Sequence, residues 1–198
     1  MKKYLIVALM LIASKGFCAW DGGLARDNYS QSQSVISYNH EKIHLGEQFN
    51  ISSMTVALAN NASTYFVIDC ATNTFTRTEM HMTFGVSTGG NAHLMLFKDV
   101  VVTSSGTAIS AVNMNQASTR TPGIRVTGNG SPISSTGTKL LEVMLPAGSS
   151  PSGKNAGAST KAEEEFILKQ GTKYLLILTN VSGSAAACNL VIEWYEEE

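Results

Sequence analysis

Two apolar stretches near the C-terminal end carry the clearest pattern of the chain. In the second stretch, Leu190, Ile192 and Trp194 occupy alternate positions, and this period of two is typical of a β-strand that buries one face. The first stretch, residues 174–178, is apolar at every position, which is typical of a strand in the centre of a sheet. A turn of small residues separates the two stretches. The pattern therefore predicts a β-hairpin with Trp194 in the core, ending at solvent in the glutamates 196–198.

Short β-rich runs fill the rest of the chain, and no helical period appears. Groups of Gly, Asn and Ser separate the runs and predict turns. About ten half-buried strands of this kind predict an all-β fold, an antiparallel β sandwich of the jelly-roll type. We expect one domain over residues 34–198. Its strands before the hairpin are expected at 34–39, 47–59, 64–70, 79–87, 92–98, 108–114, 124–127, 139–145 and 164–168.

The first 19 residues differ from the rest of the chain. A basic start precedes the unbroken apolar run 4–13, which is too short to span a bilayer but has the length of a secretory signal. Residues 1–19 are therefore interpreted as a signal-like hydrophobic helix, with cleavage after Ala19 as one option. Three alternatives stay open: a lipoprotein signal that uses Cys18, a helix that the mature chain retains, or a start site placed too far upstream.

A polar segment follows the leader. Residues 20–33 are rich in Gly, Ser, Asn and Gln, and we interpret them as an extended N-terminal arm that can lie on a neighbouring subunit. A disordered linker is the alternative. The low-complexity segment 147–160 is expected to be a long loop that contacts a partner or is disordered.

The low content of charged residues bears on which partners the chain can bind. Only 15% of the 198 residues are charged, and the net charge is −1. A chain with so little charge has no electrostatic basis for binding nucleic acid or an anionic membrane surface. We expect neither a nucleic-acid partner nor a stable membrane anchor once the leader is removed.

The sequence offers no catalytic constellation. If residues 34–44 were extended, His40 and His44 would lie about 13 Å apart, too far to share a metal ion. His81 and His93 are interpreted as ordinary surface histidines, and the acidic run 163–165 as a solvated strand edge. Neither a Gly-x-Ser-x-Gly elbow nor a phosphate-binding glycine loop occurs. We therefore expect no enzymatic activity, and assign no catalytic, cofactor-binding or metal-binding residue.

Two cysteines remain outside the leader, Cys70 and Cys188. Each lies at the end or the start of an expected strand, so a disulfide between them is geometrically possible. It would stabilise the fold by about 4–5 kcal/mol in the chain-entropy model. Two free buried thiols are the alternative, and the sequence does not decide between them.

Six short segments stand out in the following order: 38–46 (Tyr-Asn-His-Glu-Lys-Ile-His-Leu-Gly), 113–115 (Asn-Met-Asn), 145–148 (Leu-Pro-Ala-Gly), 173–176 (Lys-Tyr-Leu-Leu), 179–183 (Thr-Asn-Val-Ser-Gly) and 192–196 (Ile-Glu-Trp-Tyr-Glu). Together they resemble a family of tailed-bacteriophage virion proteins. The resemblance covers most of residues 34–196 and is closest in the C-terminal hairpin. It implies a capsid-associated jelly roll that decorates or cements the head, without enzymatic activity.

Two function classes follow from these observations. In the first, the chain is a head decoration or cement protein on the virion surface, which binds the major capsid protein or neighbouring virion subunits. It would self-associate, and we favour a trimer. In the second, suggested by the leader 1–19, it is an exported β-sandwich module that binds a glycan or a surface partner in the periplasm or outside the cell.

Overall fold

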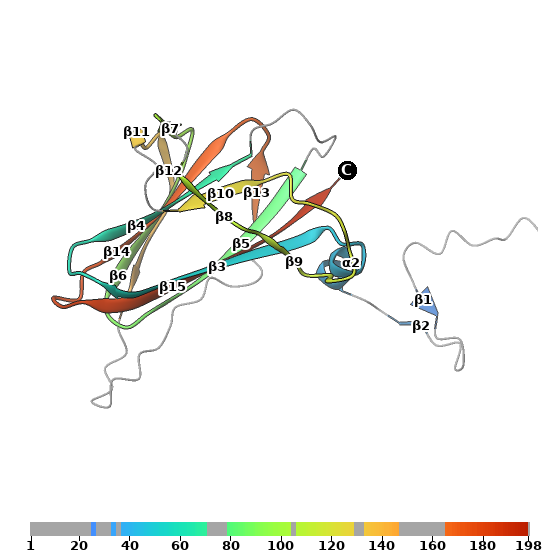
Figure 1. Ribbon diagram of the computed structural model, residues 1–198, viewed down its shortest axis with the longest axis horizontal. Coiled ribbons are helices and arrows are strands. Elements are labelled where there is room, and N and C mark those ends of the chain that lie inside the picture. Colours follow the sequence, from blue (N-terminus) through green and yellow to red (C-terminus); the bar gives the residue numbers. More distant parts are fainter. Residues whose placement is uncertain are drawn as a thin grey trace, which may run out of the picture. The chain divides into compact units, whose positions relative to one another are not determined.

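The computed structural model describes residues 37–70, 79–103, 106–128, 133–146 and 165–197 in full, and the backbone of 25–26 and 33–34 (Figure 1). The expected leader 1–19 and the expected loop 147–160 lie outside these described residues. The chain divides into two compact units, Met1–Tyr38 and Asn39–Glu198.

In the first unit, the expected arm contains one short antiparallel pair. β1 (Ala25–Arg26) pairs with β2 (Gln33–Ser34). The described residues contain no helix long and apolar enough to cross a membrane.

The second unit is an all-β sandwich of two antiparallel sheets, as expected (Figure 1). One sheet has six strands in the order β12-β6-β14-β4-β10-β8, and the other has five in the order β13-β5-β15-β3-β9. The short strands β7 and β11 form a further pair. The strands are β3 (Gln48–Leu58), β4 (Ser63–Asp69), β5 (Glu79–Thr88), β6 (Ala92–Lys98), β7 (Val101–Val102), β8 (Thr107–Ile109), β9 (Val112–Asn113), β10 (Arg125–Gly128), β11 (Ile133–Ser135), β12 (Thr138–Leu145), β13 (Phe166–Lys169), β14 (Lys173–Asn180) and β15 (Ala186–Glu197).

The connectivity is that of a jelly roll. The long strands pair from the outside of the chain inwards, β3 with β15, β4 with β14, β5 with β13 and β6 with β12. The chain is therefore folded like one long hairpin whose paired arms wrap alternately into the two sheets, which is the double Greek-key arrangement. β9 extends the five-stranded sheet beyond β3, and β10 and β8 extend the six-stranded sheet beyond β4. The expected fold class is confirmed.

Alternating side chains of both sheets meet in one core. Phe49, Trp194 and Met82 are direct cross-strand neighbours on β3, β15 and β5, and all three are buried. The rings of Phe49 and Trp194 stack with their centroids 5.8 Å apart. Leu190, Ile192 and Trp194 all belong to this core, so the predicted face of the last strand is correct.

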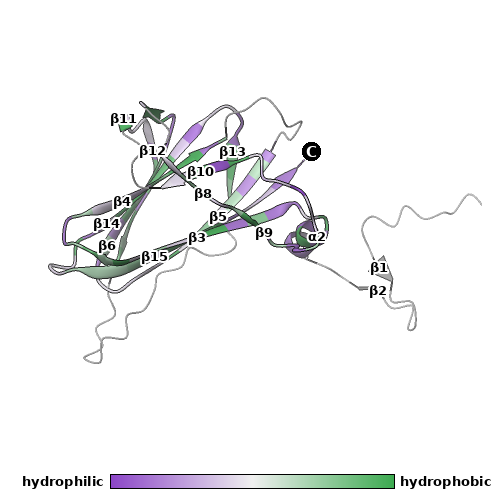
Figure 2. Cartoon of the chain, viewed as in Figure 1, coloured by the Kyte–Doolittle hydropathy of each residue, from purple (hydrophilic) through white to green (hydrophobic). Residues whose placement is uncertain are grey.

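The expectation that residues 174–178 lie centrally is also correct. β14 lies between β4 and β6, and Figure 2 shows its hydrophobic colouring. Its Leu176 faces the main core, whereas Leu175 and Ile177 belong to a second cluster on the outer face of the six-stranded sheet. Val102 and Ile133, from the β7–β11 pair, pack on this second cluster. Both faces of β14 are therefore covered by apolar side chains, which explains why residues 174–178 are apolar at every position.

The expected strand 34–39 is wrong at its end, because helix α2 (Tyr38–His44) begins at Tyr38. Ser34 belongs to β2, and residues 35–36 lie outside the described residues. Glu41 in the first turn and Lys42 and His44 in the last turn match the polarity of the helix dipole. The helix ends at His44, and Gly46 follows in the turn with a φ of +70°. The amides of Gly46 and Glu47 donate to the carbonyls of Ile43 and Lys42, which is the Schellman arrangement that favours glycine.

The expectation that the last strand ends at solvent in three glutamates is wrong for the first of them. β15 continues to Glu197, and Glu196 is completely buried. Its carboxylate accepts hydrogen bonds from residues outside β15. The alternating pattern of β15 alone does not predict these bonds.

Candidate functional site

Two of the histidines lie side by side on α2. The Nε2 atoms of His40 and His44 are 2.9 Å apart, and the ring centroids are 4.6 Å apart. The expected separation of 13 Å assumed a strand and is wrong, because residues four apart share one face of a helix. The sequence did hold a signal for this: residues 40–44 read His-Glu-x-x-His, the spacing that places two zinc ligands on one helix face.

This histidine pair does not by itself make a catalytic metal centre. Such a centre uses three protein ligands in an enclosed site. His40 and His44 are both exposed on a helix of seven residues. Among the described residues, no third ligand atom from a His, Cys, Asp or Glu joins them. The geometry is that of a two-ligand surface chelate.

A third histidine, His81, lies in an ordered polar row on the outer face of the five-stranded sheet. It is the cross-strand neighbour of Tyr195, and the two rings stack with their centroids 4.5 Å apart and their planes 10° apart. Glu165 binds both side chains: His81 Nδ1 lies 3.2 Å from its Oε2, and the Tyr195 hydroxyl donates to the same oxygen over 2.9 Å. Burial raises the pKa of Tyr195, and the bond to Glu165 raises it further.

Glu165 is exposed, as expected for the acidic run 163–165, but His81 and Tyr195 hold its carboxylate in place. Its contacts bring the start of β13 onto the faces of β5 and β15. Residues 163 and 164 lie outside the described residues. His93, the fourth histidine, is a surface residue as expected, half-buried on β6, with its Nε2 2.9 Å from Glu142 Oε1 on β12.

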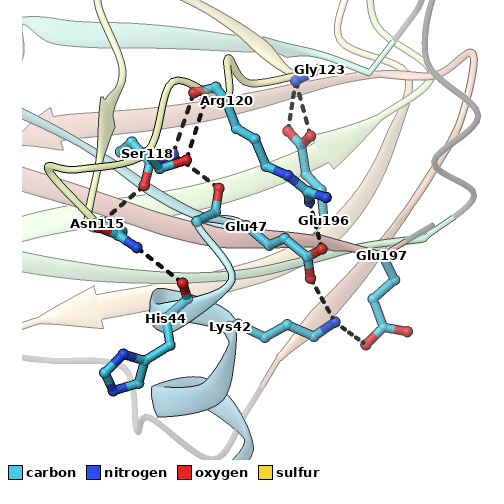
Figure 3. Close-up of polar contacts among 11 residues, drawn as sticks. Lys42, His44, Glu47, Asn115, Ser118, Arg120, Gly123, Glu196 and Glu197 are labelled. Carbon is cyan, nitrogen blue, oxygen red and sulfur yellow. Dashed lines mark hydrogen bonds and ion pairs between the residues drawn. The ribbon is translucent and has the colours of Figure 1, made fainter.

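A buried charge cluster joins α2 to the loop that follows β9 (Figure 3). Lys42 Nζ donates to Glu47 Oε2 over 3.0 Å, and Arg120 Nη1 donates to Glu47 Oε1 over 2.5 Å. Burial alone would raise the pKa of Glu47, but the hydrogen bonds and charges of Lys42 and Arg120 outweigh it and lower that pKa. Lys42 also lies 3.7 Å from Glu197.

The neighbouring side chain of Glu196 is fully buried, and both of its carboxylate oxygens accept hydrogen bonds. It accepts hydrogen bonds from the backbone amide of Gly123 (Figure 3). The backbone amide of Ile124 and Trp194 Nε1 also donate to it, and all these bonds measure 2.8–3.2 Å. These contacts fasten a loop and a helix to the sandwich.

The cysteines are free. Cys70 and Cys188 are both buried in the main core and form no disulfide, so the free-thiol alternative describes this chain. Burial raises the pKa of Cys70 to about 12, with a smaller contribution from the nearby carboxylates of Asp69 and Glu196. Burial also raises the pKa of Cys188. Thiols in this state are unreactive.

Strand β12 forms one edge of the six-stranded sheet and carries exposed apolar side chains. Within the described residues β12 pairs only with β6, so its other side presents backbone donors and acceptors. Leu140 and Met144 are exposed, Met144 to 59%. Val143, two residues before the buried Leu145, is also exposed. This strand combines an open edge with apolar side chains.

No family model, curated protein or solved structure matches the chain. What the chain does must therefore be argued from its own residues.

Proposed function

We propose that this chain is a non-enzymatic structural protein of a bacteriophage virion that joins copies of itself and the capsid lattice at the head surface. The observation that carries the proposal is the open, apolar edge strand β12. The ordered resemblance of segments between 38 and 196 to tailed-phage virion proteins supports the same conclusion. Jelly rolls are a common architecture of viral capsid domains.

Within the described residues, the outer edge of β12 has no pairing strand. Soluble proteins generally protect an edge strand with charges, proline, a bulge or a covering segment. β12 has two of these features, the charged residues Lys139 and Glu142 and a register irregularity between Lys139 and Leu141. The two charged side chains form an ion pair with each other, however, and Glu142 also contacts His93. Paired charges repel a neighbour less than isolated ones do. Next to them, Leu140 and Met144 offer apolar area to whatever docks there.

A second copy of the chain is the occupant we propose for this edge. Contacts between an edge and a different surface of the next copy are heterologous, and they close into a ring when the rotation permits. We favour a trimer for this reason. On a lattice of capsid subunits, several weak contacts of one oligomer act together, so firm attachment does not require one strong site.

One observation favours a second function. The signal-like leader 1–19 is suited to an exported protein, and jelly rolls are also common in lectins. On this alternative the chain is a glycan-binding or surface-binding module that is secreted or periplasmic.

The edge contact can be tested by replacing Leu140 and Met144 together with threonine, which keeps a high β propensity but removes apolar area. We expect the wild-type chain to have an oligomeric mass by light scattering. The double variant should need at least a tenfold higher concentration to assemble. The matched control replaces Met54 and Val56, two exposed apolar residues of β3, and should assemble like the wild type.

Circular dichroism and thermal melting establish that both variants are folded. A wild-type chain that stays monomeric at high concentration would contradict the proposed edge contact. So would a result in which the control on β3 dissociates and the β12 variant does not.

A further inference from the structure

Three potential metal ligands meet on the outer face of the five-stranded sheet, at the ends of β5 and β15. Glu79 and His81 share one face of β5, and Glu197 is the direct cross-strand neighbour of Glu79. One ligand atom from each of the three lies within 4.8 Å of the others. Among the described residues, this is the group of at least three His, Cys, Asp or Glu residues that can converge on one ion.

The imidazole of His81 is oriented for this role. An ionised carboxylate only accepts hydrogen bonds, so the contact with Glu165 places a proton on Nδ1. Nε2 is buried and has no hydrogen-bond partner. Its nearest charged neighbour is Glu79 Oε2, at 3.8 Å, which is too long for a hydrogen bond. A carboxylate that holds Nδ1–H while Nε2 faces a cation is the usual arrangement around metal-binding histidines.

Two carboxylates lie next to each other at this position. Like charges directly opposite each other in a sheet are destabilising, and Glu79 and Glu197 are such a pair. Lys42 approaches Glu197 to 3.7 Å, but the same ammonium group also forms the shorter bond to Glu47. A divalent cation between Glu79 and Glu197 would neutralise both carboxylates and give Nε2 of His81 a partner.

We propose that Glu79, His81 and Glu197 form a binding site for a divalent metal ion, and that Glu165 orients the histidine. One imidazole nitrogen and two carboxylate oxygens, with a fourth position left for water or a partner's ligand, suit Zn²⁺. The same set suits Ca²⁺ or Mg²⁺ less well, because those ions prefer oxygen ligands alone. The bound ion ties β5 to the C-terminal end of β15.

The test titrates Zn²⁺ into the full chain after removal of metals by a chelator, with calorimetry for affinity and thermal melting for stability. We expect Zn²⁺ to bind at least tenfold more tightly than Ca²⁺ or Mg²⁺ and to raise the melting temperature. Glu79→Gln should weaken Zn²⁺ binding at least tenfold and abolish the rise. Glu79 is exposed, so this variant keeps the fold.

The control is His40→Ala, which breaks the two-histidine pair on α2 and leaves the proposed ligands intact. It should keep the Zn²⁺-dependent rise in melting temperature. The proposal is overturned if the wild-type chain does not bind Zn²⁺, if Glu79→Gln binds it as tightly as the wild type, or if His40→Ala abolishes the binding.

Discussion

Replacing Trp194 with alanine should lower the free energy of unfolding by about 3–5 kcal/mol, the range for large aromatic truncations in cores. Trp194 is 2% exposed, stacks on Phe49, and lies in direct register with Met82. The change therefore removes packing between three strands. It also removes the Nε1–H group that donates to Glu196 over 3.0 Å. Denaturant unfolding of the purified chain measures the difference.

Two further variants separate these contributions. Trp194→Phe keeps most of the packing and loses only the donor, so it should cost less than Trp194→Ala. Met54→Ala, on the exposed face of β3, should change the stability by less than about 0.5 kcal/mol. A loss of under about 1 kcal/mol for Trp194→Ala would contradict the assignment of this face to the core.

Replacing Glu196 with alanine should cost about 2–4 kcal/mol, although the residue carries a charge and lies at the end of the chain. Its carboxylate accepts bonds from the amides of Gly123 and Ile124 as well as from Trp194. Each buried donor left without an acceptor costs about 1–3 kcal/mol, and water entering the vacated space recovers part of that. Thermal and denaturant unfolding of Glu196→Ala measure the loss.

The control for Glu196 is Glu41→Ala, which removes a carboxylate from the exposed face of α2. It should change the stability by no more than about 0.5 kcal/mol. If Glu196→Ala were as mild as Glu41→Ala, the three bonds to Glu196 would not contribute to the stability of the sandwich.

Most of the sandwich could be predicted from the sequence because each strand carries its own evidence. Alternation at Leu190, Ile192 and Trp194 identifies the buried face without knowledge of any partner strand. The apolar run 174–178 likewise indicates a central strand. The jelly-roll pairing follows the expected class, but which strand neighbours which depends on contacts between distant segments.

The errors come from residues whose environment is supplied by other parts of the chain. Residues 38–44 are too few for a convincing helical period, and their helix is secured by Gly46 and by the contact of Lys42 with Glu47. Glu196 looks like a solvent-facing charge, yet amides 73 and 72 residues away in sequence hold it in the core.

The candidate metal site was missed for the same reason. Its ligands come from β5 and from the end of β15, so no local spacing joins His81 to Glu197. Only the register between these two strands brings the ligands together. The His-Glu-x-x-His spacing of residues 40–44, in contrast, was visible in the sequence and would have indicated a helix.

The central claim is that the chain is a structural protein of a phage head. The most direct measurement mixes the purified protein with heads of the parent phage prepared without it and determines the number of copies bound per particle. Our account predicts saturable binding at a fixed number of copies, by a chain that is oligomeric in solution. A monomer that does not bind heads, but binds a glycan on an array, would contradict the account in favour of the exported module.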